Sequence, residues 1–166
     1  MLRLSAHAGA RAGIITVALS ESDVDGVAAA VRNAAGDGAF SAMLVFFSSA
    51  LDAAALAATL KRDVDIPVQV GCSTAGEIGP FGMTDGGAVA LLFPAETFRC
   101  FAGLVTQISR HGFERGIACA QQLKERCAEM AGGAIEHAAF AVTLIDGLSN
   151  CEEVMVSAFQ TELREF

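Results

Sequence analysis

The alternation of strand-like and helix-like segments constrains this chain more than any other feature. Residues 13–19 read as an uncharged strand, residues 22–35 carry apolar side chains at helical spacing, and residues 42–47 form a second strand-like run. A second helix is predicted over 51–61 and a third strand over 66–70. This order is typical of βαβ crossovers, which join parallel strands. We therefore predict an α/β fold with a largely parallel sheet and helices on both of its faces.

The second half of the chain departs from this alternation. The apolar runs 88–93 and 98–105 are separated by four residues, too few for a parallel crossover, so they predict an antiparallel hairpin insertion. A helix over 113–130 and a strand over 138–145 follow. The chain should end in a helix that begins with a capping box over residues 149–152.

Length and composition limit the class of protein. The 166 residues suit one globular domain, expected over 13–166 after an N-terminal tail at 1–12. A net charge of −8 opposes binding to nucleic acid or anionic lipid. No apolar run is long enough to span a membrane, and the N-terminus lacks the core of a secretory signal. Because of this N-terminus we expect a cytoplasmic protein. Five cysteines without a CxxC pair favour reduced thiols.

Small polar residues follow three of the predicted strands. In an open parallel sheet, ligands bind beyond the carboxyl ends of the strands, where helix N-termini and backbone N–H groups converge. Serines at these positions can also be no more than helix caps. We nevertheless predict that the group lines one crevice for a small polar ligand. Its members are Ser48, Ser49, Cys72, Ser73, Thr74, Glu77, Asp146 and Ser149.

The densest polar segment, residues 71–77, is open to three interpretations. It is a structural turn, or its amides and hydroxyls hold a ligand, or Cys72 or Ser73 is the nucleophile of a hydrolase or transferase. A nucleophile needs a neighbouring base, and no histidine lies nearby in sequence. The histidines also lack metal-ligand spacing, although a single axial ligand to haem needs only one residue, such as His111, His137 or Cys72.

The segment Val70-Gly71-Cys72-Ser73-Thr74-Ala75-Gly76-Glu77-Ile78 resembles the hallmark of the FIST N-terminal domain, a bacterial sensory domain of signal transduction. A preceding strand that ends in Phe-Ser-Ser and a later Asp-Gly-Leu-Ser before a helix look like that family in the same order. The resemblance covers approximately residues 13–166. Family members typically continue beyond the position of Phe166, so we expect the domain to be incomplete at its C-terminus.

The resemblance implies a domain that senses a small ligand and signals to a protein partner such as a histidine kinase. Some stand-alone members bind haem and sense nitric oxide, which makes haem the cofactor suggested by the family. We expect no enzymatic activity. An apolar strand near the end of the chain also predicts self-association as a homodimer. The alternatives are the Cys72 or Ser73 enzyme and a purely structural interaction domain.

Overall fold

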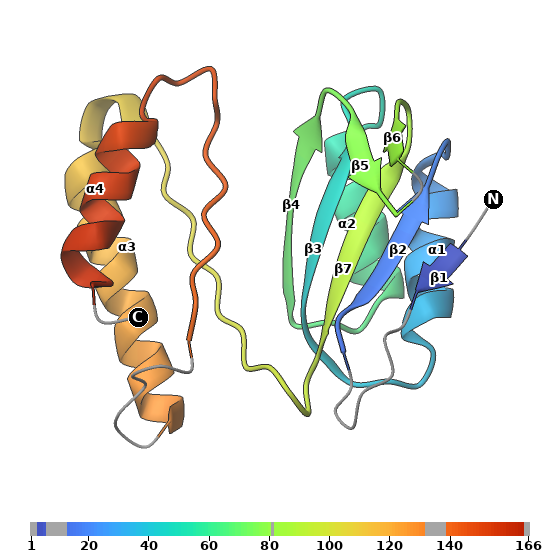
Figure 1. The fold of residues 1–166 in the computed structure, drawn as a ribbon, viewed down its shortest axis with the longest axis horizontal. Helices are drawn as coiled ribbons and strands as arrows, with labels where there is room; N and C mark the ends of the chain where they lie inside the picture. Colours follow the sequence, from blue (N-terminus) through green and yellow to red (C-terminus); the bar gives the residue numbers. More distant parts are fainter. Residues whose placement is uncertain (1–2, 6–12, 81, 132–138, 165–166) are drawn as a thin grey trace. The chain divides into compact units, whose positions relative to one another are not determined.

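The computed structural model describes residues 3–5, 13–80, 82–131 and 139–164 (Figure 1). The chain divides into two compact units, Met1–Cys100 and Phe101–Phe166, and each is described by itself. Residues 3–5, within the expected N-terminal tail, form an edge strand of the first unit. The boundaries expected for the tail and for the domain stay predictions.

The first unit is built on a five-stranded sheet of order β1-β2-β7-β3-β4. Its strands are β1 (Arg3–Ser5), β2 (Ile15–Leu19), β7 (Ala88–Pro94), β3 (Phe40–Ser48) and β4 (Val68–Thr74). Only β3 and β4 pair in parallel, because β7 lies between β2 and β3 and runs antiparallel to both. The α/β class is confirmed, but the largely parallel sheet is wrong. β2, β3 and β4 do share one direction, as βαβ crossovers require.

The hairpin predicted for 88–93 and 98–105 is also wrong. The first run forms β7, whereas residues 98–105 form no strand. The physical reason is that both edges of β7 already carry ladders, one to β2 and one to β3. The expected strand at 138–145 is likewise absent from its described part, residues 139–145. An apolar segment does not form a strand unless the edge of a sheet pairs with it.

Both helices of the first unit cover the same face of the sheet (Figure 1). They are α1 (Val24–Ala35) and α2 (Ala53–Asp63), and they pack on a core that includes Met43, Leu56 and Leu92. Two right-handed crossovers that advance in the same direction across a sheet place their helices on one side. The described residues of this unit therefore place no helix on the second face, contrary to the expected helices on both faces.

Carboxylates cap both helices of the first unit. Asp23 accepts a hydrogen bond from the amide of Gly26 at the start of α1. Asp52 accepts from the amides of Ala54 and Ala55 at the start of α2. Each carboxylate satisfies otherwise unpaired N–H groups and interacts favourably with the positive helix end. Ser49 consequently does not cap α2.

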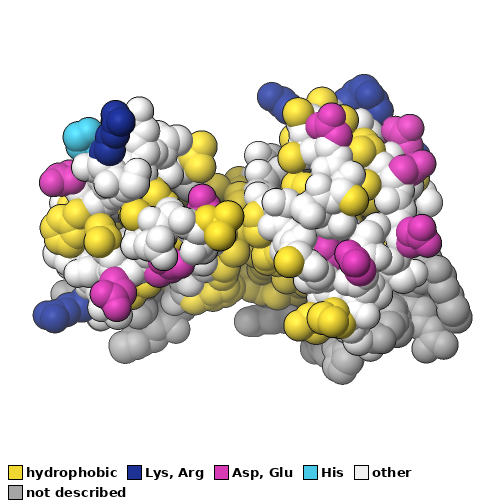
Figure 2. All heavy atoms as spheres, turned by 90° about the horizontal axis from the view of Figure 1, so that it is seen from above, with side chains coloured by type: hydrophobic (Ala, Val, Ile, Leu, Met, Phe, Trp, Pro, Cys, Tyr) yellow, Lys and Arg dark blue, Asp and Glu magenta, His cyan; other side chains and the backbone are white. Residues whose placement is uncertain are grey.

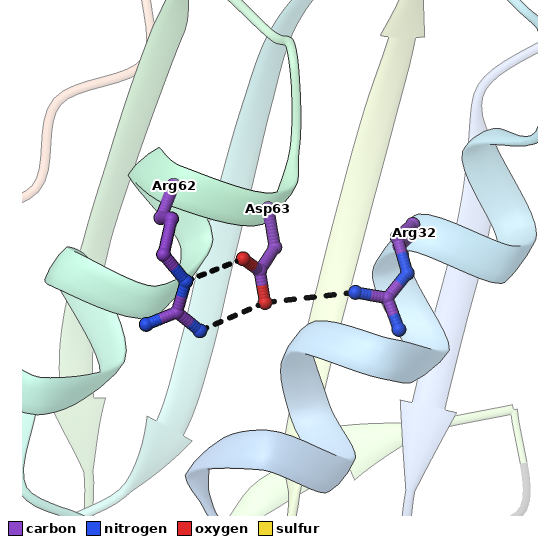
Figure 3. A network of polar contacts seen from close by, with 3 residues as sticks. All are labelled: Arg32, Arg62 and Asp63. Carbon is purple, nitrogen blue, oxygen red and sulfur yellow. Dashed lines mark hydrogen bonds and ion pairs between the residues drawn. The ribbon is translucent and has the colours of Figure 1, made fainter.

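A polar contact joins the last turns of α1 and α2 (Figure 3). The carboxylate of Asp63 accepts two hydrogen bonds from Arg62, at 2.6 and 3.0 Å, and lies 3.5 Å from a guanidinium nitrogen of Arg32. The hydrogen bond from Arg62 lowers the pKa of Asp63, and the charge of Arg32 acts in the same direction. The two arginines thus offset the unfavourable position of an acid at the C-terminal end of a helix.

Within the described part of the first unit, the opposite face of the sheet carries no helix. Strand alternation places Leu44, Phe46, Val70 and Cys72 on this face, all half-buried. At one end it meets a small hairpin of β5 (Glu77–Gly79) and β6 (Gly82–Thr84). We call this surface the open face.

The second unit is a helical hairpin of α3 (Ile108–Ala131) and α4 (Glu152–Glu162). The helices approach closely at Gly116, where a Cβ would lie 2.8 Å from the Cβ of Ala158. The capping box predicted over 149–152 is wrong, because Cys151 is the N-cap and makes no side-chain capping bond. Among the described residues, the helices are too short or too polar to cross a bilayer.

Candidate functional site

The carboxyl ends of β3 and β4 lie side by side. Ser48 is the register partner of Thr74, and the amide of Ser49 donates to the Thr74 carbonyl oxygen at 3.3 Å. Parallel pairing brings together these residues, which are more than twenty positions apart in the chain. Seen from above, the first unit presents mostly uncharged atoms, with separate acidic side chains and basic side chains at its rim (Figure 2).

Glu77 is the buried centre of this edge. Its side chain is 2% exposed. One carboxylate oxygen accepts from the Thr74 hydroxyl at 2.7 Å, and the other accepts from the Gly87 amide at 3.2 Å. The Thr74 oxygen also lies 3.4 Å from the Phe47 carbonyl oxygen, but its single proton favours the nearer carboxylate. Through these two hydrogen bonds, Glu77 connects β5 to the end of β4 and to the residue before β7.

Gly87 is a site residue that our sequence analysis missed. A Cβ at this position would overlap the carbonyl oxygen of Leu19, so only glycine fits beside β2. Its carbonyl accepts from the amide of Ser48 at 2.9 Å, while its amide binds Glu77. The available signal was the pair Gly86-Gly87 immediately before an apolar run, since such a pair marks a close backbone approach.

Strand alternation separates the residues of the 71–77 segment. Cys72 is the register partner of Phe46 and lies on the open face, whereas Ser73 is the partner of Phe47 and lies on the helix-covered face. Ser73 and Ser49 are both exposed. Within the part of the chain that the structure describes, neither hydroxyl bonds to a protein group, so both remain available to a ligand.

Cys72 has the opposite properties to those of an activated nucleophile. Its thiol is partly buried, and this burial raises its pKa. A raised pKa lowers the fraction of thiolate, the reactive form, at neutral pH. In the first unit, no described histidine is present to act as its base. These properties do not favour Cys72 as a nucleophile.

Asp146 and Ser149 belong to the second unit and form a turn of their own. The Asp146 carboxylate accepts from the amide of Leu148 at 3.0 Å, and the Ser149 hydroxyl donates to the Asp146 carbonyl oxygen. The preceding residues form no strand, so the strand-end rule does not place these two beside Thr74 and Glu77. The structure brings together Ser48, Ser49, Thr74 and Glu77, and the full eight-residue site stays a prediction.

The described hollows of the first unit offer no axial ligand for haem. His137 lies outside the described residues, and His111 is exposed at a kink in α3. A hollow of about 890 Å³ between α2 and β4 in the first unit is lined by neither histidine nor cysteine. The described residues also contain no group of three or more side chains that could hold a metal ion.

These features define a mixed α/β domain whose strand-end motif surrounds a buried carboxylate. The model of the FIST N domain matches residues 41–165, from β3 through α4, and so includes the whole 71–77 segment. The chain therefore belongs to the FIST N domain family, a family of sensory domains in signal transduction. Searches of curated proteins and of solved structures returned no significant match.

Proposed function

We propose that this domain senses a small polar ligand at the edge where β3 and β4 end. The observation that carries the proposal is the pair of exposed hydroxyls of Ser49 and Ser73, which bond to no described protein group. The backbone around them is held by the buried contacts of Glu77 with Thr74 and Gly87. A fixed frame that presents unbonded hydroxyls is preorganised to hold a ligand by hydrogen bonds.

The hairpin β5–β6 offers a route from this edge to a signalling partner. Glu77 anchors its inner side, while Ile78 and Met83 form a cross-strand pair on the outer side, each 80% exposed. Two adjacent large apolar side chains at the surface are typical of a protein contact. We propose that ligand binding shifts the hairpin through Thr74 and Glu77, and that a partner such as a histidine kinase contacts Ile78 and Met83.

The proposal involves ligand binding without catalysis. The raised pKa of Cys72 disfavours a thiolate nucleophile, and Ser73 lies on the opposite face of the strand from Cys72. No disulfide forms among the described residues, which agrees with the reducing cytoplasm that we propose as the setting. Haem is not part of the proposal, because the described hollows offer it no axial ligand.

Thermal unfolding in the presence of small polar probes tests the proposal. The probes are the proteinogenic amino acids, short dicarboxylates and free sugars, and unfolding is followed by far-UV circular dichroism. We expect one class of probe to raise the Tm of the native chain, because a ligand that binds only the folded state stabilises it. The shift should be lost in Ser49→Ala and in Ser73→Ala.

The matched control is Ser157→Ala, which removes an exposed serine from α4 in the other unit. It should keep the ligand-induced shift in full. A shift that survives in both site variants would place binding elsewhere on the chain. The absence of a shift with every probe would reject the proposal for these three classes of ligand.

A further inference from the structure

We propose that the outer edge of β4 joins two copies of this domain into one continuous sheet. β4 pairs only with β3, and no other described segment pairs with its outer edge. Proteins usually protect such an edge with a charged side chain, a proline or a bulge. The seven residues Val68–Thr74 contain no charge and no proline, and their register with β3 is uninterrupted.

The residue pattern of β4 is the same in both directions. Gly71 lies at its centre. On each side of Gly71 come an apolar residue, then a polar residue, then a β-branched residue. A two-fold axis at Gly71 would place Val70 of one copy opposite Cys72 of the other in an antiparallel ladder. The same register places Gln69 opposite Ser73. Apolar side chains therefore face apolar ones and polar side chains face polar ones, as a self-complementary contact between identical chains requires.

The two faces of the joined sheet differ in what they bury. On the open face, the pairs of Val70 with Cys72 would continue the half-buried apolar surface formed by Leu44 and Phe46. On the helix-covered face, the centre of the contact is Gly71, whose Cβ would lie 2.7 Å from the carbonyl oxygen of Val45. No side chain therefore obstructs the two-fold axis on this face.

The hollow between α2 and β4 supports a second copy as the occupant. It measures about 890 Å³, and apolar side chains such as Met43 and Leu56 contribute to its lining. Ala53 and Ala57, both small and exposed, line its α2 side. When two such sheets join through β4, the α2 helix of the second copy lies beside this α2 over the paired strands. Small residues at that position allow two helices to approach closely.

The inference does not depend on the proposed ligand function. The pairing is made by the backbone of β4, and the two proposals share Ser73 and Thr74. Experiments without added probe therefore test the pairing alone, and they can fail or succeed whatever happens in the thermal-shift experiment.

Site-directed cross-linking tests the register. In Val70→Cys, the new thiol should face Cys72 of the second copy at the Cβ separation of a directly opposed pair, about 4.5–5.5 Å, close to disulfide geometry. Within one chain the two positions are neighbours along the same side of a strand and are too far apart to bond. Mild oxidation should yield a covalent dimer, and peptide mass spectrometry should identify the link between positions 70 and 72.

Val68→Cys is the matched control, because it places a thiol on the same strand and the same face but opposite Thr74. It should give no link to Cys72. A covalent dimer of Val70→Cys linked through another cysteine, or an equal yield from Val68→Cys, would overturn the proposed register.

Sedimentation measures the association itself. The native chain should form dimers, and Ser73→Lys should weaken them at least about tenfold, since a lysine on an edge strand opposes pairing. Ser157→Lys makes the same change of charge on α4 and should leave the dimer unchanged. A native chain that remains monomeric at its highest soluble concentration, or a dimer indifferent to Ser73→Lys, would refute the proposal.

Discussion

Thr74→Val replaces the hydroxyl with a methyl group of similar size, so it isolates the hydrogen bond from Thr74 to Glu77. The hydroxyl donates to the carboxylate at 2.7 Å, and the carboxylate belongs to a side chain that is 2% exposed. Losing a partner at a buried carboxylate costs about 1.5–3 kcal/mol. The Gly87 amide still binds the other oxygen, so we expect a value near the middle of that range, about 2 kcal/mol.

Hydrogen exchange of the β7 peptide is the appropriate assay. The chain has neither tryptophan nor tyrosine, and the helices of both units contribute to the circular dichroism signal. The amides of residues 88–93 report on the first unit alone. A loss of about 2 kcal/mol should make them exchange about thirtyfold faster where exchange follows the opening equilibrium.

Thr74→Ser is the control, because it keeps the hydroxyl and removes only a methyl group. It should cost distinctly less than Thr74→Val. If the two variants exchange at the same rate, the hydroxyl contributes no measurable stability, and our account of Glu77 as the anchor of the hairpin is incorrect. In the double variant of Thr74→Val with Glu77→Gln, we expect the losses of stability to be non-additive, because the two residues share one hydrogen bond. If the hydroxyl contributes nothing, the two losses should simply add.

Three further predictions follow from single contacts. Gly71→Ala should destabilise the first unit by about 1–3 kcal/mol in chemical denaturation, because its Cβ meets the Val45 carbonyl; an unchanged midpoint would contradict this. Because burial raises the pKa of Cys72, its alkylation should be slower than that of a free thiol at pH 8 and should rise at a higher pH; a midpoint below that of N-acetylcysteine would reverse the conclusion. Haemin should give no saturable Soret shift with this chain, and a shift abolished by replacing His111 would overturn our assessment of haem.

Local sequence signals predicted the part of the fold that local interactions determine. The elements β2, α1, β3 and α2 begin and end within two residues of their expected ranges, because their apolar spacing and capping carboxylates act within a few residues. β4 differs, because it spans residues 68–74 and not 66–70, so Cys72, Ser73 and Thr74 lie within the strand and not after it. The position of β7 was not predictable in this way. Its two ladders join it to strands far away in the chain, and an apolar run carries no information about which edges remain vacant.

The candidate site likewise contains residues that local sequence could predict and residues that depend on distant strand pairing. Thr74 and Glu77 lie three residues apart at the end of a strand, so their proximity could be inferred from sequence. Gly87 enters the site only because β7 is inserted beside β3, a step that sequence reasoning did not foresee. Asp146 was placed by assuming a strand before it, and no strand forms among the described residues there.

The insertion of β7 between β2 and β3 also has a consequence for synthesis of the chain on the ribosome. Ile15 must pair with Leu92, and Leu92 must pair with Met43, before the centre of the sheet exists. The first two helices and three of the long strands therefore emerge with their apolar faces unmatched, and they must wait for residue 94 to leave the exit tunnel. Nascent chains stalled just before β7 should accordingly remain sensitive to protease and dependent on chaperones, whereas chains stalled well after it should become resistant in one step.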